Sequence, residues 1–82
     1  MNKETTKPII KCNLKAILDE RKREGNEISI RKLADKAGLN FETVRRLYND
    51  ETKQYHRESV AAVCVALDVE LSELLTLDKG EL

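Results

Sequence analysis

Polar and charged side chains gather in the middle of the chain, between Asn40 and Arg46. An ionised Glu42 can only accept hydrogen bonds, whereas Arg45 and Arg46 carry planar guanidinium groups that donate hydrogen bonds in a fixed fork. Side chains with these properties can recognise the edges of nucleic-acid bases. The stretch follows a turn and opens a predicted helix, which would present its arginines on a polar face. This is the layout of a DNA-reading helix.

Two short helices joined by a turn at Gly38 would position these side chains. Ser29 and Asn40 are favourable N-cap residues, because their side-chain oxygens accept hydrogen bonds from the first turn of a helix. Gly38 readily adopts the left-handed conformation that ends a helix. Apolar residues at the spacing of a hydrophobic staple flank both caps: Ile28 with Leu33, and Leu39 with Val44. The residues of this unit that are expected in the core are Leu33, Ala34, Val44 and Leu47.

The flanking elements are predicted from caps and apolar spacing. Helices are expected over about 14–24, 57–67 and 71–76, the first capped by Asn13 and the second with His56 at its cap position. Residues 9–12 are compatible with a short strand or an extended segment. Residues 50–55 lack an apolar stripe and predict a loop. The expected organisation is a flexible arm at 1–8, a helix-turn-helix domain at 9–78 and a tail at 79–82.

The composition indicates one soluble globular domain. The chain has 82 residues, of which 40% are hydrophobic and 37% are charged. No apolar run approaches the roughly 18 residues that a membrane-spanning helix needs, so no membrane partner is expected. The N-terminal stretch lacks the apolar segment and cleavage site of a secretory signal, which predicts a cytoplasmic location.

No residues have the spacing of a catalytic or metal-binding motif. Cys12 and Cys64 lie far apart without a CxxC pair, and His56 is the only histidine. We therefore interpret the two cysteines as small buried hydrophobic residues. The sequence also has no glycine-rich phosphate loop and no HExxH-type motif. It predicts no metal, no cofactor and no enzymatic activity.

Charge is distributed unevenly along the chain, although the net charge is zero. Residues 1–57 hold fourteen Lys or Arg against nine Asp or Glu, whereas residues 58–82 hold one Lys against six acidic residues. The first part therefore carries +5 and the second −5. DNA binding depends on a local positive face rather than on the total charge. The first part, which contains the predicted helix-turn-helix, is expected to face DNA.

The chain resembles the Cro/repressor-type helix-turn-helix family, also called XRE-like, over nearly all of residues 12–77. Three segments carry the resemblance: IIKCNLKAILDER, ISIRKLADKAGLNFETVRRLYN and VAAVCVALDVELSELL. The resemblance implies an all-α, compact five-helix DNA-binding domain of the lambda-repressor type. A short strand at the N-terminus is compatible with this fold. In this family the third helix lies in the major groove of double-stranded DNA, and the preceding helix crosses the backbone.

By this similarity, three side chains of the third helix occupy base-reading positions: Phe41, Glu42 and Arg46. Arg46 can bind guanine with two hydrogen bonds, Glu42 can accept from the cytosine amino group, and Phe41 can pack on a thymine methyl. The DNA-backbone contacts that the resemblance and the residue types suggest are Arg31, Lys32, Asn40, Thr43, Arg45, Asn49 and Lys53. Ile30 departs from the family, since many members have a phosphate-clamping glutamine there. Arg31 or Lys32 would have to supply that charge.

Two structural alternatives compete with these assignments. Glu42 and Arg46 are four residues apart and could form an intrahelical ion pair instead of reading bases. Phe41 could pack against its own domain.

The functional hypothesis is a sequence-specific DNA-binding transcriptional regulator, a small repressor that acts as a homodimer on a palindromic operator. The C-terminal leucines exceed what a short surface helix needs and are expected to form the dimer interface: Leu71, Leu74, Leu75 and Leu77. The alternative is a protein-interaction module, of the antitoxin or anti-repressor type, built on the same fold. In either case a regulatory protein partner could modulate the chain.

Overall fold

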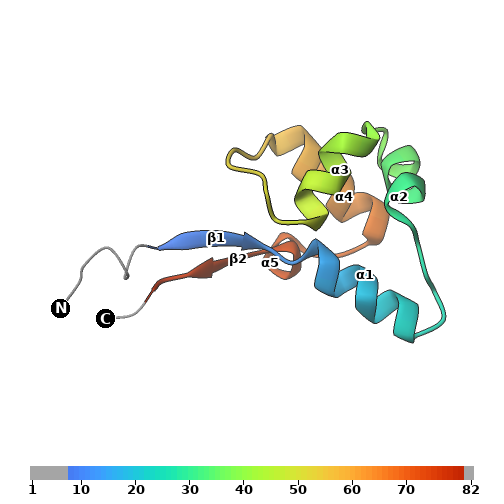
Figure 1. Cartoon of the computed structure of the whole chain (residues 1–82), viewed down its shortest axis with the longest axis horizontal. Coiled ribbons are helices and arrows are strands. Elements are labelled where there is room, and N and C mark those ends of the chain that lie inside the picture. Colours follow the sequence, from blue (N-terminus) through green and yellow to red (C-terminus); the bar gives the residue numbers. More distant parts are fainter. Residues whose placement is uncertain (1–7, 81–82) are drawn as a thin grey trace.

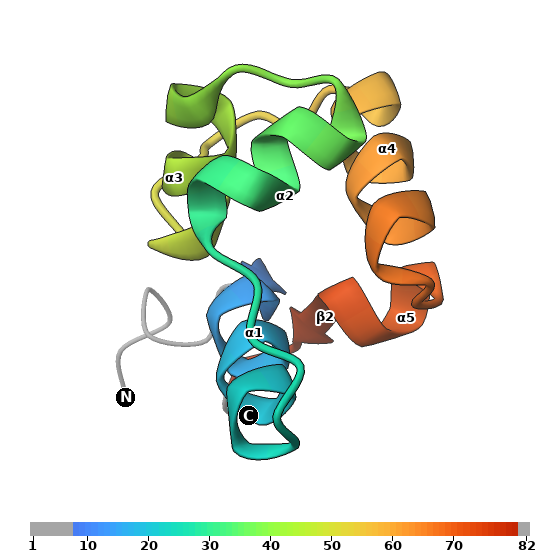
Figure 2. The same cartoon turned by 90° about the vertical axis from the view of Figure 1, so that its right-hand side faces the viewer.

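Five helices and one two-stranded antiparallel sheet make up the computed structural model over residues 8–80, the part of the chain that it describes. The elements, in order, are β1 (Ile9–Cys12), α1 (Leu14–Arg23), α2 (Ile30–Ala37), α3 (Phe41–Tyr48), α4 (Arg57–Leu67), α5 (Leu71–Leu74) and β2 (Leu75–Asp78). Helices α2, α3 and α4 lie on one side, with α1, α5 and the sheet beneath them (Figures 1 and 2). The arm predicted at 1–8 lies outside the described residues except for Pro8.

The caps around Gly38 form as the sequence predicts. The Ser29 hydroxyl accepts a hydrogen bond from the Lys32 N–H at 3.1 Å, and the Asn40 carbonyl oxygen Oδ1 accepts one from the Thr43 N–H at 2.8 Å. Gly38 ends α2 in the left-handed region with φ of 71°. A side chain at this φ is strained, which explains the glycine. The caps and the glycine together fix where α2 ends and α3 begins.

Asn13 and His56 stand at the predicted N-cap positions of α1 and α4, but neither side chain caps its helix. Asn13 precedes α1, but its side chain makes no capping hydrogen bond to that helix. Its amide nitrogen instead donates to the Glu73 carbonyl and to the Thr76 hydroxyl, both at 3.3 Å, because β2 lies next to this position. His56 precedes α4 and likewise makes no side-chain cap bond.

The predicted fifth helix at 71–76 is too long, and the fold is not purely α-helical. Helix α5 ends at Leu74, and Leu75–Asp78 continue as β2. In the antiparallel register, Ile9 faces Asp78, Ile10 faces Leu77, Lys11 faces Thr76 and Cys12 faces Leu75. Pairing with β1, more than 60 positions away, satisfies backbone groups that an isolated last turn of helix would leave open. The short strand at 9–12 is confirmed.

The core joins the helices to the base of the sheet. Its fully buried side chains are Leu14, Leu33, Val44, Val63, Leu67 and Leu74. Ala34 and Leu47 are also buried, so the four core residues predicted for the helix-turn-helix unit are confirmed. The Arg21 guanidinium donates to the Leu67 carbonyl at 2.6 Å and ties α1 to the end of α4. No helix within the described part of the chain is long and apolar enough to cross a membrane.

Candidate nucleic-acid interface

Helix α3 is held with one face inward and the other outward. Val44 and Leu47 are buried, and Tyr48 is half-buried against the core. The 3.6-residue period therefore directs Glu42 and Arg46 to solvent, and both are exposed. Because α3 is anchored by its caps and by two buried side chains, the outward face is presented on a rigid support.

One carboxylate connects the charged side chains of this face. Glu42 accepts two hydrogen bonds from Arg45, at 2.6 Å from Nη2 and 3.1 Å from Nε. The Arg46 Nε lies 3.5 Å from Glu42 Oε2, and Arg45 Nη2 lies 3.6 Å from a carboxylate oxygen of Glu51. The hydrogen bonds from Arg45 are the main cause that lowers the pKa of Glu42 below its usual value. In the DNA-free chain, the intrahelical ion pair considered from the sequence is thus present.

These ion pairs do not remove Arg46 from the surface. Its side chain is largely exposed, and only its Nε approaches Glu42. Arg45 is the more constrained arginine, since it lies between two carboxylates and is only about one-third exposed. Ion pairs this exposed to water contribute little to stability, so a stronger partner can replace them.

Phe41 and Arg31 are stacked on each other across the turn. The Arg31 guanidinium carbon lies 4.7 Å from the centre of the Phe41 ring, which brings the start of α2 against the start of α3. Phe41 remains 37% exposed, so it is partly packed on its own domain and partly presented outward. The sequence assigned these two residues separately, to base and backbone contacts. Nothing in their spacing indicated that they touch.

A groove of about 800 Å³ runs beside α3, between this helix, the following loop and the start of α4. Its lining includes four of the predicted backbone-contact residues and two of the predicted base-reading residues: Asn40, Thr43, Arg45 and Lys53, with Glu42 and Arg46. Sequence reasoning missed three of the lining residues, Tyr55, His56 and Ser59. These residues come from the loop after α3 and from the first turn of α4 and belong to no motif, so only the tertiary structure places them here.

Three predicted backbone contacts lie away from this groove. Arg31 stacks on Phe41, and Asn49 is exposed at the C-terminal cap of α3. Lys32 lines a second hollow with Arg21 and Lys36, between α1, α2 and the end of α4. Ile30, at the position of the family's glutamine, packs against the core and offers no polar group.

The leucines predicted as a dimer interface separate into three environments. Leu71 and Leu77 are 57% and 55% exposed, and Leu75 is half-buried. Leu74 has no exposed surface, because it fills the core between α5 and the other helices. The assignment of Leu74 to a dimer interface therefore needs correction, since its side chain is already used inside the chain.

The two cysteines belong to the core of the domain or pack against it. Cys12 is buried and Cys64 is half-buried, and burial raises the pKa of both thiols. Within residues 8–80, no three His, Cys, Asp or Glu side chains are grouped so that they could hold a metal ion.

The comparisons with known proteins agree with the geometry of α2 and α3. A search of the curated proteins found no match. A family model described as the Cro/C1-type HTH DNA-binding domain matches residues 13–80, from the position before α1 to the end of the described chain. This match covers most of the 82 residues and includes both helices of the turn unit, the groove and β2. The chain therefore belongs to the Cro/C1-type helix-turn-helix DNA-binding domain family.

Proposed function

We propose that the protein is a sequence-specific transcriptional regulator, a small dimeric repressor that reads the major groove of a palindromic operator with α3. The observation that carries the proposal is the outward face of α3, which presents Glu42, Arg45 and Arg46 beside an open groove. The helix is capped at its N-terminus and anchored by buried side chains on its inner face. A helix of this kind fits the roughly 12 Å wide major groove of B-DNA.

Each proposed base contact uses a side chain that reaches the surface. The guanidinium of Arg46 would donate two hydrogen bonds to the O6 and N7 atoms of guanine. Glu42 would accept from a cytosine amino group, and the exposed part of the Phe41 ring would pack on a thymine methyl. The stack with Arg31 limits the positions that this ring can adopt.

The ion pairs of α3 would exchange partners when DNA binds. Arg45 is held by Glu42 and Glu51 in the free chain, and a phosphate would take their place. The cost of this exchange is modest because the pairs are exposed to water. Release of Arg45 would in turn leave the Glu42 carboxylate available for a cytosine amino group.

The proposed backbone contacts surround this face. Their donors come from the turn and loops as well as from α3, as phosphate contacts commonly do. The Asn40 oxygen is engaged in the cap, so its amide nitrogen is the group that remains for a phosphate. The full proposed set is Arg31, Lys32, Asn40, Thr43, Arg45, Asn49 and Lys53.

Repression would occur by occlusion of the operator. One recognition helix reads only a few base pairs, so two copies on half-sites about 34 Å apart would supply a longer and symmetric site. The expected cytoplasmic location would give the protein access to such DNA. A regulatory protein could act on the surfaces that DNA leaves exposed.

Selection of bound sequences from random duplex DNA, carried out at two salt concentrations, tests this function. We expect enrichment of a two-fold symmetric site with half-sites about one helical turn apart. The double variant Glu42→Ala with Arg46→Ala serves as the control, and it should lose the enriched bases while it retains weak, salt-sensitive binding. Failure of the native chain to enrich any sequence at either salt concentration would contradict the proposal.

A further inference from the structure

The stack of Arg31 on Phe41 joins the first turns of two different helices. Arg31 is the second residue of α2, and Phe41 is the first residue of α3. The two helices lie side by side (Figures 1 and 2), and the Arg31 guanidinium carbon lies 4.7 Å from the centre of the Phe41 ring. The stack therefore connects a residue proposed for a phosphate to a residue proposed for a base.

Both members of the stack are attached to well-held backbone. The residue before each of them is fixed by the domain, since Ile30 packs against the core and Asn40 caps α3. Between the two helices, the Leu39 N–H donates to the Ala34 carbonyl at 2.9 Å and closes the turn. The relative position of the guanidinium and the ring is therefore decided by their own side-chain rotamers.

The Arg31 guanidinium has no competing carboxylate. Within residues 8–80, no ion pair includes Arg31, whereas Arg45 and Arg46 both pair with Glu42. A guanidinium that stacks through its flat face keeps its N–H groups at the edge, where they can donate to a phosphate. One side chain can thus hold the ring and bind the DNA backbone at the same time.

The contact with Arg31 limits how the Phe41 ring is presented. The ring is 37% exposed, and the guanidinium lies over one of its faces. The negative face of an aromatic ring attracts a cation, and this attraction increases when water is excluded, as in a complex with DNA. The remaining surface of the ring is therefore offered to DNA in a restricted orientation.

We propose that Arg31 is a positioning residue for base recognition: its guanidinium holds the Phe41 ring against the C5-methyl group of a thymine while its edge binds a phosphate. The proposal rests on the proposed function and adds to it, because Arg31 then contributes to sequence preference as well as to affinity. Its charge alone is not sufficient, since a lysine lacks the flat group that stacks on the ring.

An NMR experiment on the full chain without DNA tests the stack itself. The side-chain protons of Arg31 should resonate upfield of ordinary arginine positions, because they lie near the face of the Phe41 ring. Phe41→Ala should return them to ordinary positions, and circular dichroism would verify that this variant keeps its helices. Unshifted Arg31 resonances in the native chain would overturn the inference, whatever the chain does with DNA.

Binding to modified duplexes tests the base contact. The thymines of the selected half-site are replaced one at a time by deoxyuridine, which lacks only the C5-methyl group. We expect the native chain to bind one of these duplexes about fourfold more weakly, the effect of one buried carbon. Phe41→Ala should bind that duplex and the thymine duplex equally.

Arg31→Lys separates the charge from the stack. This variant keeps a cation, so the salt dependence of binding should stay unchanged, while the preference for thymine over deoxyuridine should fall below about twofold. The matched control is Lys32→Gln, which removes the neighbouring cation that lines the second hollow. It should reduce the salt slope by about one phosphate contact and keep the full thymine preference.

The outcomes distinguish this inference from the proposed function. Full thymine preference in Arg31→Lys, or an equal loss of preference in Lys32→Gln, would show that the stack does not position the ring. A native chain that selects its site without any effect of a thymine methyl group would also overturn the inference, and it would leave the proposed function standing. A native chain that selects no DNA sequence would remove the proposed function and this inference together.

Discussion

Glu42 forms ion pairs with both Arg45 and Arg46 of α3 in the free chain. This single carboxylate therefore affects how readily either arginine can contact DNA. It is bound mainly to Arg45 and only weakly to Arg46. We interpret the difference as a division of roles, in which Arg45 exchanges a carboxylate for a phosphate and Arg46 remains available for a base. The next two predictions test this division.

The first prediction concerns Arg46. Replacement by alanine should weaken binding to the selected site by about 1–3 kcal/mol and should relax recognition at one base pair. Fluorescence anisotropy with duplexes that vary one position at a time measures both effects. Arg23→Ala removes an exposed arginine from the end of α1 and serves as the control, with sequence preference unchanged. Full retention of base preference in Arg46→Ala would remove this residue from the reading set.

The second prediction concerns the titration of Glu42. Because Arg45 lowers the pKa of this carboxyl, Glu42 should titrate below the ordinary glutamate range in an NMR titration. A depressed pKa means that the pairing is present at neutral pH and is lost as pH falls through the folded-state pKa. Arg45→Ala should move the pKa of Glu42 upward, and Arg46→Ala should move it less. Equal shifts in the two variants would show that Arg45 is not the dominant partner.

At the scale of the elements, the caps decide where α3 begins. Ser29 and Asn40 accept the predicted hydrogen bonds and Gly38 adopts the predicted left-handed conformation. These features depend on residues within three or four positions of one another, so local spacing in the sequence was sufficient to predict them.

The features that the sequence could not reveal depend on distant contacts. Leu75–Asp78 has helix-compatible leucines, and only its pairing with β1 makes it a strand. Asn13 stands at the N-cap position of α1, but its side-chain amide donates to Glu73 and Thr76, which are distant in sequence, instead of capping the helix. The stack of Arg31 on Phe41 and the groove that includes Tyr55 likewise require α2, α3 and the following loop to be assembled. Local patterns therefore predicted the helices, whereas the neighbours of each side chain required the tertiary structure.

The third prediction concerns the cap of α3. Asn40→Ala should lower the free energy of unfolding by about 1 kcal/mol, because the Thr43 N–H loses its acceptor. His56→Ala changes the residue before α4, which makes no side-chain cap bond, and should cost clearly less. Urea unfolding monitored by circular dichroism gives both values. Equal losses in the two variants would mean that the Asn40 cap adds nothing to stability.

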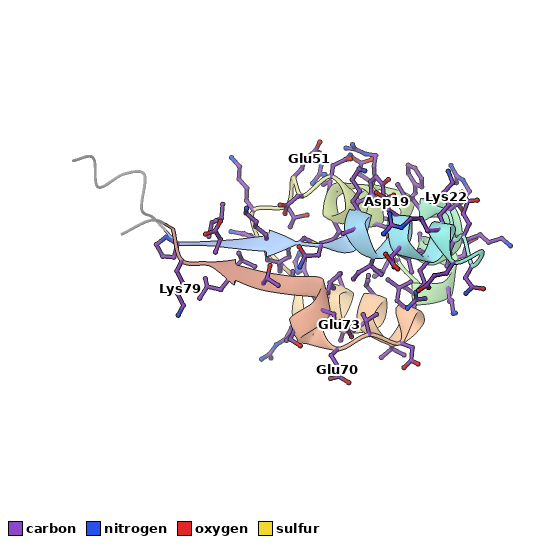
Figure 3. All side chains as sticks on the ribbon, turned by 90° about the horizontal axis from the view of Figure 1, so that it is seen from below. Asp19, Lys22, Glu51, Glu70, Glu73 and Lys79 are labelled. Atoms are coloured by element: carbon purple, nitrogen blue, oxygen red, sulfur yellow. The ribbon has the colours of Figure 1, made fainter. Side chains whose placement is uncertain are left out.

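At the scale of the whole molecule, charge and shape divide the chain into two sides. Figure 3 shows Glu70 and Glu73 on one side, away from Glu51, which lies in the loop that borders the groove. Two acidic side chains of the C-terminal part therefore lie away from the loop that borders the groove. An acidic surface opposite a DNA-facing surface would help to orient the molecule as it approaches DNA.

The last prediction follows from this division of charge. If the groove side faces DNA, the logarithm of affinity should fall linearly with the logarithm of salt concentration, with a slope of about −0.9 for each phosphate neutralised. Lys53 lines the groove, so Lys53→Gln should reduce that slope by about one contact and weaken all sequences alike. Lys79 lies at the outer end of the two-stranded sheet in Figure 3, and Lys79→Gln should leave the slope unchanged. A slope that changes with Lys79 but not with Lys53 would place the DNA on the sheet instead of on α3. A slope near zero in the native chain would mean that the division of charge plays no part in binding.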